Sequence, residues 1–171
     1  NIPNNTAFFI ASLHQSLFET FFLQTIFNSP VFILKKELLK IPVFGWYLKK
    51  IGSIYIDRNK TTKENLNFFD QISNLVKSSN RPLIIFPQGS RLKPDDRTSF
   101  KKGASRIYDE LKIKCQPVAI NSGNVWPKVG KLKPNQNLTI SILKPIESGM
   151  NRDIFLKNLQ NNIYFELDNL S

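Results

Sequence analysis

Histidine, cysteine and methionine are the scarcest side chains of this sequence, which has one of each in 171 residues. The single cysteine, Cys115, excludes a disulfide within the chain and is typical of proteins from a reducing compartment. We expect its thiol to be a small buried group of the core. The only histidine is His14, so any imidazole chemistry depends on that position.

Long hydrophobic runs are also missing. No stretch reaches the roughly 18 consecutive apolar residues that a membrane-spanning helix requires, and the first residues lack the charged and then apolar layout of a signal peptide. The sequence begins at Asn1 rather than at methionine. We therefore expect a membrane-associating segment to precede it.

Acidic side chains are few, because 13 Asp and Glu stand against 24 Lys and Arg, a formal net charge of +11. This excess favours an anionic partner: nucleic acid, an anionic membrane surface or a phosphate-bearing substrate. Charge alone does not choose among the three. With 41% hydrophobic residues the composition is that of a globular protein, and we expect residues 1–171 to form one domain.

Short apolar runs rich in β-branched and aromatic residues alternate with helical patterns along most of the chain. This alternation predicts an α/β fold, a single layered domain in which helices flank a mostly parallel sheet. The segment 138–143 alternates with a period of two, which predicts an edge or antiparallel strand. We predict strands at 7–13, 31–34, 53–56, 83–86 and 116–120, and helices at about 17–27, 37–50, 62–77, 101–112 and 153–167.

Polar residues follow the ends of four predicted strands. They are HQSLFE at 14–19, DRN at 57–59, PQGSR at 87–91 and NSG at 121–123. Ligands of open α/β sheets bind beyond the carboxyl ends of the strands. We therefore expect the four clusters to share one site, although the NSG cluster specifies no chemistry by itself.

His14 and Glu19 allow two interpretations. Ser16 and Glu19 fit a capping box, in which the serine caps a helix and the glutamate reaches back to the amide of the capping residue. Helical spacing also directs Glu19 into the apolar arc of its helix, near Phe22 and Leu23, where a carboxylate needs a partner. If that partner is His14, Glu19 fixes the tautomer of the ring, and the other ring nitrogen can accept a proton from a substrate hydroxyl. The residues alone leave both interpretations open.

Basic residues predict an anion-binding rim around His14. Arg58 follows a strand with a guanidinium suited to a phosphate, although a solvated surface residue is the simpler interpretation. Gly89 and Arg91 lie in a turn after another strand, and that turn could equally have no further role. Lys101 stands at a predicted helix start, where free amides favour an anion.

In this order, the four clusters resemble the motifs of the glycerolipid acyltransferases, the family that includes 1-acyl-sn-glycerol-3-phosphate acyltransferases. The family's first motif is a His, four residues and an Asp, and HQSLFE is similar to it with Glu19 at the acidic position. Its second motif ends a strand in Arg, as GSIYIDR does at Arg58. The third, Phe-Pro-Glu-Gly-Thr-Arg, is similar to FPQGSR at 86–91, and the fourth, an apolar stretch with a proline, to CQPVAINSG at 115–123. Order and spacing agree across roughly residues 6–125.

Three positions depart from the family pattern. Glu19 adds one methylene to the family Asp and keeps the carboxylate. Gln88 replaces the family Glu and removes a negative charge, so we expect a rim that attracts a phosphate more strongly, and the role that the family gives this carboxylate is open here. Ser90 replaces the family Thr and keeps the hydroxyl.

The resemblance implies a glycerol-3-phosphate acyltransferase-like fold and transfer of an acyl group to 1-acyl-sn-glycerol 3-phosphate, which makes phosphatidic acid in phospholipid biosynthesis. His14, oriented by Glu19, would deprotonate the acceptor hydroxyl, which would attack the thioester of acyl-CoA or acyl-carrier protein. No acyl-enzyme is needed, so Cys115 is not expected to be a nucleophile, and no metal or cofactor is implied besides the acyl donor as co-substrate. The acceptor phosphate would be held by the rim residues, Arg58, Gly89, Ser90, Arg91 and Lys101.

Both substrates are amphiphiles, so the resemblance also implies a site that opens at an anionic membrane surface, on the cytoplasmic face of the inner cell membrane. We expect exposed aromatic residues in the mixed apolar and basic stretch 41–52, at Phe44, Trp46 and Tyr47. An ordinary amphipathic helix packed on the sheet explains the same stretch equally well.

Other functions are compatible with parts of the sequence. The acceptor could be glycerol 3-phosphate or another lysolipid. A scaffold that binds lipid without turning it over is a second alternative, suggested by Gln88. A nucleic-acid-binding domain would need Lys and Arg interleaved with exposed aromatics in a groove. The basic residues are instead spread along the chain and His14 has no role in that function, so we expect no nucleic-acid partner.

Overall fold

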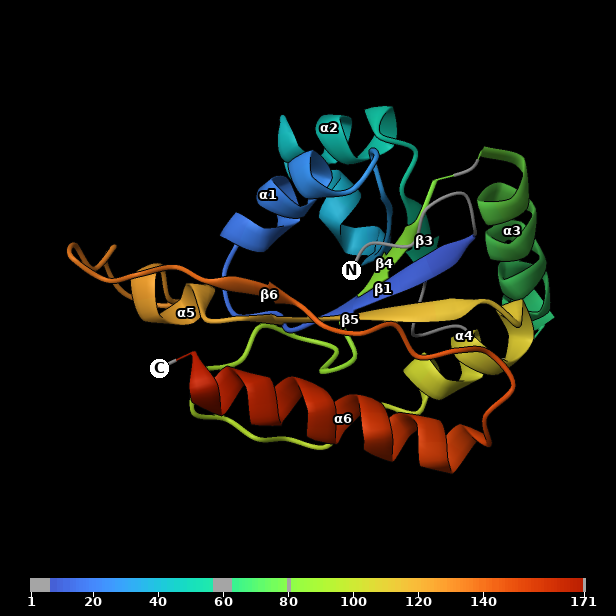
Figure 1. Cartoon of the computed structure of the whole chain (residues 1–171). Helices are drawn as coiled ribbons and strands as arrows, with labels where there is room; N and C mark the ends of the chain where they lie inside the picture. The colour runs from blue at the N-terminus through green and yellow to red at the C-terminus, as the bar shows by residue number, and fades with distance from the viewer. Residues whose placement is uncertain (1–6, 57–62, 80, 171) are drawn as a thin grey trace.

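Six strands form one sheet in the order β3-β2-β4-β1-β5-β6 (Figure 1) in the computed structural model, which describes residues 7–56, 63–79 and 81–170. The first five strands are parallel to their neighbours, and β6 runs antiparallel to β5. The mostly parallel α/β sheet with an antiparallel strand at its edge is therefore confirmed. The strands are β1 (Phe8–Ser12), β2 (Val31–Lys35), β3 (Ile54–Ile56), β4 (Leu83–Ile85), β5 (Lys114–Ile120) and β6 (Ile140–Ile142).

Helices cover both faces of the sheet (Figure 1). They are α1 (Phe18–Ile26), the 3-10 helix η1 (Lys36–Lys40), α2 (Phe44–Lys50), α3 (Lys63–Ser79), α4 (Gly103–Leu111), α5 (Ser122–Val125) and α6 (Arg152–Asn169). α1 and α2 lie on one side of the sheet, and α4 and α6 lie on the other (Figure 1). Across the described residues, no helix combines the length and the apolar character needed to cross a bilayer.

The alternating side chains of β1 divide the core into two layers. Phe9 and Ala11 belong to a larger cluster that includes apolar residues of α3, α4 and α6. Phe8 and Ile10 point the opposite way, into a smaller cluster with Leu23 of α1. This is the period of two that a strand buried on both faces must have, so β1 is held from both sides at the point where it leads into the site.

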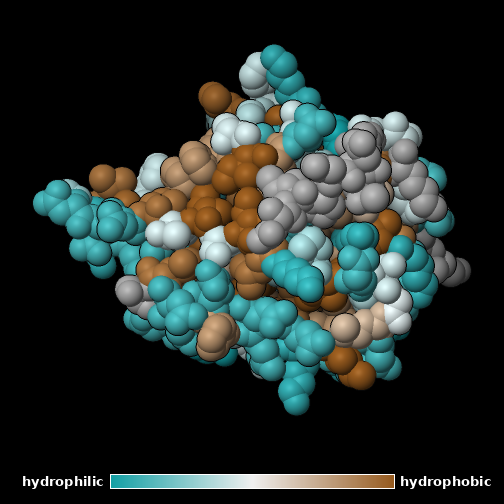
Figure 2. All heavy atoms as spheres, viewed as in Figure 1, coloured by the Kyte–Doolittle hydropathy of each residue, from teal (hydrophilic) through white to brown (hydrophobic). Residues whose placement is uncertain are grey.

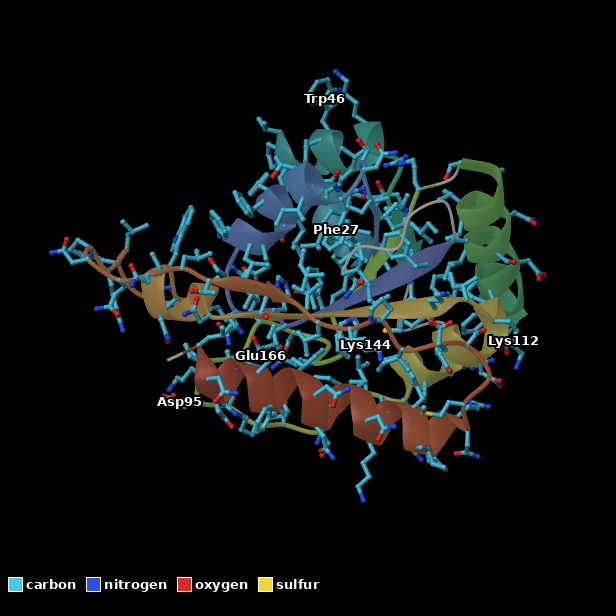
Figure 3. All side chains as sticks on the ribbon, in the orientation of Figure 1. Phe27, Trp46, Asp95, Lys112, Lys144 and Glu166 are labelled. Carbon is cyan, nitrogen blue, oxygen red and sulfur yellow. The ribbon has the colours of Figure 1, made fainter. Side chains whose placement is uncertain are left out.

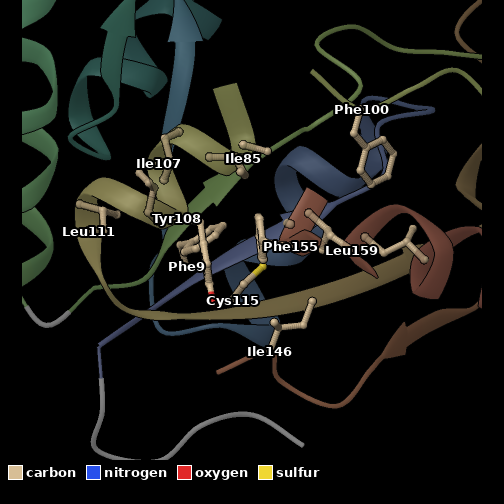
Figure 4. Packing of buried hydrophobic residues seen from close by; sticks show 14 of the residues in the cluster. Phe9, Ile85, Phe100, Ile107, Tyr108, Leu111, Cys115, Ile146, Phe155 and Leu159 are labelled. Carbon is tan, nitrogen blue, oxygen red and sulfur yellow. The ribbon is translucent and has the colours of Figure 1, made fainter. Parts of the chain in front are cut away.

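The larger cluster is built around stacked aromatic rings (Figure 4). The rings of Tyr108 and Phe155 are 3.8 Å apart and nearly parallel, and Phe9 lies 6.3 Å from Phe155. Cys115 is fully buried in the same cluster, as its sequence predicts. Burial raises the pKa of the Cys115 thiol well above its usual range, so the thiol is a neutral packing group.

The single helix predicted at 37–50 is wrong, because the chain forms two short pieces, η1 and α2, with a break between them. Pro42 has no backbone N–H and disfavours the helical conformation of the residue before it. Ile41 is accordingly extended, with φ −75° and ψ 120°. Gly45 then allows α2 to pack closely on η1, since a Cβ there would overlap the carbonyl oxygen of Leu39.

Of the three aromatic residues expected to be exposed in this stretch, only Trp46 is, at 64% (Figure 3). The prediction is wrong for Phe44 and Tyr47, which are partly buried. Phe21 of α1 covers them, with its ring 6.1 Å from that of Phe44 and 5.6 Å from that of Tyr47. Figure 2 shows hydrophobic side chains gathered over α1, where Phe21 and Phe22 are 46% and 40% exposed.

Two phenylalanines of α6 test the contribution of the larger cluster to stability. We expect Phe155→Ala to lower the free energy of unfolding by about 3–5 kcal/mol, because it opens a cavity beside Tyr108. Phe165→Ala is the matched control: its ring is 71% exposed, so the change should stay within about 0.5 kcal/mol. Urea denaturation followed by circular dichroism measures both, and equal losses would contradict this account of the core.

Candidate active site

The carboxylate of Glu19 is fully buried at the carboxyl-terminal edge of the sheet. Its Oε1 accepts hydrogen bonds from the backbone amides of Gln15 at 2.6 Å and Ser16 at 2.7 Å, and lies 2.9 Å from Nδ1 of His14. Its Oε2 accepts from the hydroxyl of Ser122 at 2.8 Å. Four donors therefore compensate the loss of water around this carboxylate.

The imidazole of His14 lies between this carboxylate and the open part of the site. An ionised carboxylate only accepts hydrogen bonds, so Nδ1 of His14 carries a proton and Nε2 keeps a free lone pair. The ring stacks on Phe86, with centroids 4.1 Å apart and planes 15° apart. The His14 side chain is 19% exposed whereas Glu19 is fully buried. The pair thus has one buried end that orients the ring and one accessible end that can accept a proton.

The capping-box interpretation of Glu19 is confirmed only in part, because Leu17 rather than Ser16 is the N-cap of α1 and no side chain caps it. The carboxylate reaches back to the amide of Ser16 as a capping box requires, and the same oxygen meets His14. The helix starts at Phe18, and the Ser16 hydroxyl accepts from the Phe18 amide at 3.2 Å. The predicted apolar surroundings are wrong in part, because Phe22 is 40% exposed and the carboxylate meets polar donors. Capping therefore fixes the carboxylate in place independently of any substrate.

Gln88 lies behind His14 rather than at the rim, and its effect on the attraction of the rim for a phosphate stays a prediction. Its side chain is 4% exposed, and its Oε1 accepts from the backbone amide of His14 at 2.9 Å. Its Nε2 then donates to the hydroxyl of Tyr164 at 3.5 Å, and that hydroxyl donates to the carbonyl of Thr98 at 2.7 Å. Burial raises the pKa of the Tyr164 phenol, which keeps it a donor. Gln88 therefore connects the His14 loop to α6.

A cavity of about 370 Å³ opens beside His14. Its lining combines cationic and small polar groups with apolar side chains. The first set is Thr20, Lys35, Gly89, Ser90, Arg91, Lys101, Gly103 and Lys128. The second set includes Leu17, Ile33, Leu34, Leu38, Phe44, Ile85, Phe86, Ala104 and Ile107. Among the lining residues that the structure describes, four are cationic and none is acidic, so the cavity suits an anionic group attached to an apolar one.

Four of the five predicted rim residues line this cavity with His14: Gly89, Ser90, Arg91 and Lys101. The fifth, Arg58, lies outside the described residues, and its placement stays a prediction. Gly89 has a φ of +79°, a conformation that favours glycine. In the described part of the chain, no three acidic, histidine or cysteine side chains are grouped so that they could hold a metal ion.

The sequence model of the Acyltransferase family matches residues 1–121, which is most of the chain. The protein belongs to this acyltransferase family. The match contains the His14 loop, the Gly89 turn and every other lining residue of the cavity except Lys128.

Known acyltransferases resemble the chain in sequence and in fold. It is 35% identical over 133 residues to a 1-acyl-sn-glycerol-3-phosphate acyltransferase of Pseudomonas aeruginosa, covering 78% of this chain and 51% of that protein. It is 38% identical over 116 residues to one of Helicobacter pylori, covering 66% and 48%. The chain thus spans about half the length of these curated relatives. The crystal structure of a 1-acyl-sn-glycerophosphate acyltransferase from Thermotoga maritima superposes with a TM-score of 0.80 at 23% identity, covering 99% of this chain and 68% of that one. This likeness establishes the acyltransferase fold.

Sequence reasoning missed several residues of the site. Ser122 donates to Glu19, and the amide of Gly123 donates to Oε1 of Gln15 at 3.0 Å. Both lie in the NSG cluster, and its position after a predicted strand was the feature of the sequence that could have indicated these two residues. Lys35 stands at the end of β2 and gave the same signal. Lys128 reaches the cavity from the loop after α5, which no local pattern indicates.

A pair of buried serines tests the donors around Glu19. We expect Ser122→Ala to lower the free energy of unfolding by about 1–3 kcal/mol, because it leaves a buried carboxylate oxygen without a donor. Ser105→Ala is the control, since Ser105 is equally buried but donates to the Lys102 carbonyl. That carbonyl keeps a hydrogen bond from the Arg106 amide. We therefore expect Ser105→Ala to lower the free energy of unfolding by at most about 1 kcal/mol. A Ser122→Ala protein no less stable than Ser105→Ala, in urea denaturation, would contradict the importance of this donor.

Proposed function

We propose that the protein transfers a fatty acyl group from an acyl thioester to the free hydroxyl of 1-acyl-sn-glycerol 3-phosphate, producing phosphatidic acid for phospholipid biosynthesis. The observation that carries this proposal is the His14 and Glu19 pair beside a cavity lined with both cationic and apolar side chains. An acceptor with one phosphate and one acyl chain matches both parts of the lining. The names of the similar acyltransferases support the same substrate.

In the proposed mechanism, Nε2 of His14 takes the proton from the acceptor hydroxyl. The hydroxyl oxygen forms a bond to the thioester carbonyl carbon, and the carbon–sulfur bond then breaks as His14 returns its proton to the leaving thiolate. Glu19 orients the ring and stabilises the imidazolium that forms in between, because its carboxylate lies 2.9 Å from Nδ1. Acyl-CoA and acyl-carrier protein both supply the required thioester, and the mechanism needs no other cofactor.

A direct transfer of this kind agrees with the position of the only thiol. Cys115 lies in the larger core cluster, fully buried, and its raised pKa keeps it protonated. The reaction therefore proceeds without an acyl-enzyme on cysteine.

The amide at position 88 does not favour a scaffold without activity. Gln88 bonds to the backbone of His14 and to Tyr164, away from the cavity lining. The amide at this position therefore replaces neither the proton-accepting nitrogen nor any side chain of the cationic lining. The catalytic interpretation rests on His14, and that residue keeps its carboxylate partner.

The membrane is the proposed source of the acceptor, on the cytoplasmic face of the cell membrane. Exposed apolar residues surround the helices that border the cavity, and they would bind the bilayer interface. They are Leu17, Phe21, Phe22, Ile41, Val43 and Trp46. We call them the α1–α2 patch. Two residues of the cavity lining lie at the starts of these helices, Leu17 just before α1 and Phe44 at the first position of α2. An acyl chain leaving the bilayer therefore has a short apolar path to His14.

Substitution of His14 tests catalysis directly. We expect His14→Ala to lower the turnover number for acyl transfer by roughly 100- to 10,000-fold, because the proton acceptor is lost. The measurement is release of free thiol from acyl-CoA in the presence of 1-acyl-sn-glycerol 3-phosphate. Phe165→Ala, on the exposed face of α6, is the control and should keep full activity. Unchanged turnover in a folded His14→Ala protein would exclude the mechanism.

The rim residues are tested by the choice of acceptor. Arg91→Ala and Lys101→Ala should each reduce kcat/KM roughly 10- to 100-fold for 1-acyl-sn-glycerol 3-phosphate, because each removes a charged donor to the phosphate. The same variants should keep their kcat/KM for a monoacylglycerol, which has no phosphate. Lys112→Ala is the control, since this exposed lysine follows the last residue of α4 (Figure 3), pairs with Asp109 and is not part of the cavity lining. If glycerol 3-phosphate is the better acceptor of the wild-type protein, the assignment of the acceptor is wrong while acyl transfer stands.

A further inference from the structure

The segment between α5 and β6 extends beyond the body of the domain (Figure 1). We call residues 126–137 the projecting loop. Its base is closed, because the amide of Lys133 donates to the carbonyl of Val125 at 2.8 Å. Neither core cluster includes any of its residues. The loop therefore has a defined place but contributes no side chain to the hydrophobic core.

Apolar and cationic side chains alternate on the projecting loop. Val129 is 83% exposed and Leu132 is 59% exposed. Lys131 and Lys133 flank Leu132 and are exposed as well. The loop sequence, WPKVGKLKPNQN, contains no acidic residue. In Figure 2 the projection carries both hydrophobic and hydrophilic side chains. Single exposed apolar residues are common in proteins, but two within four positions, each beside a lysine, on a segment outside both core clusters, indicate a binding surface.

The projecting loop also borders the cavity. Lys128, its third residue, lines the cavity and donates to the carbonyl of Arg91 at 3.3 Å. The α1–α2 patch borders the same cavity through Leu17. Two sets of exposed apolar residues, far apart in the sequence, are thus joined by one cavity.

We propose that the projecting loop is a second membrane contact, in which Val129 and Leu132 enter the interface of an anionic bilayer while Lys131 and Lys133 bind lipid phosphates. A bilayer is an extended partner that suits both the α1–α2 patch and the projecting loop, which border the same cavity through Leu17 and Lys128. Interleaved lysines and apolar residues match such a surface in charge and in polarity. The inference rests on the proposed function only in taking the acceptor from the membrane.

Vesicle binding of the full chain tests the loop. The probes are vesicles of phosphatidylcholine alone and of phosphatidylcholine with an equal part of phosphatidylglycerol. We expect Val129→Asp with Leu132→Asp, and separately Lys131→Glu with Lys133→Glu, to weaken partitioning onto the anionic vesicles by roughly tenfold or more. Ile154→Asp with Lys157→Glu is the matched control, because both residues are exposed at the start of α6. The control should partition like the wild-type protein.

A fluorescent reporter locates the contact. The chain has two tryptophans, so Trp46→Phe with Trp126→Phe gives a background without them, and Val129→Trp then places one indole on the projecting loop. We expect its emission to shift to shorter wavelength with anionic vesicles and to stay unchanged with phosphatidylcholine alone. An emission that does not change with anionic vesicles overturns the proposal.

Activity assays separate this inference from the proposed function. The loop variants should keep the wild-type turnover with a short-chain, water-soluble acceptor and lose activity only when the acceptor is presented in anionic vesicles. A wild-type protein that binds vesicles through the loop but transfers no acyl group would exclude the proposed function and leave the loop contact intact. Unchanged vesicle binding, together with a raised KM for acyl-carrier protein but not for acyl-CoA, would instead assign the loop to an acidic carrier and overturn the membrane contact.

Discussion

The site depends on the burial of one carboxylate, that of Glu19. A charge without water requires donors, and Glu19 obtains them from two amides before α1, from the ring of His14 and from Ser122 after β5. These donors come from separate segments that only the parallel order of β1 and β5 brings together. The need of the buried carboxylate for hydrogen-bond donors therefore also fixes the orientation of the imidazole.

The neutral side chain at position 88 is consistent with this single buried charge. His14 is held by its ring through Glu19 and by its backbone through Gln88. A second carboxylate behind the loop would add another buried negative charge to be compensated. An amide instead offers an acceptor to the His14 amide and a donor to the Tyr164 hydroxyl. The Tyr164 hydroxyl in turn donates to the Thr98 carbonyl, so each hydrogen bond of this chain has one donor and one acceptor. The departure from the family residue thus preserves the position of the loop without a charge.

Features set by local chemistry could be predicted from the sequence. The strands follow from the apolar runs, and the cost of an unpaired carboxylate made His14 one of two candidate explanations for Glu19. Features that depend on distant segments could not. In the sequence, Ser122 is only a serine after a predicted strand, and its bond to Glu19 at 2.8 Å depends on the folded arrangement. Tyr47 belongs to a stretch that is typical of a membrane interface, and the sequence does not show that Phe21 covers it. Pro42 was a local signal that the helical periodicity of 37–50 concealed.

The division of the cavity lining follows from the topology of the sheet. The loops after β1 and β4 contribute His14, Gly89, Ser90 and Arg91, because parallel strands deliver their carboxyl ends to one edge. The neighbouring strand β2 continues instead into η1 and α2, which contribute apolar groups such as Leu38 and Phe44. His14 lines the same cavity as both sets of side chains, and its ring stacks on Phe86 while its Nδ1 faces Glu19. In the proposed reaction, a proton acceptor at this junction meets the part of a phosphate-bearing lipid that lies between headgroup and acyl chain, which is its glycerol hydroxyl.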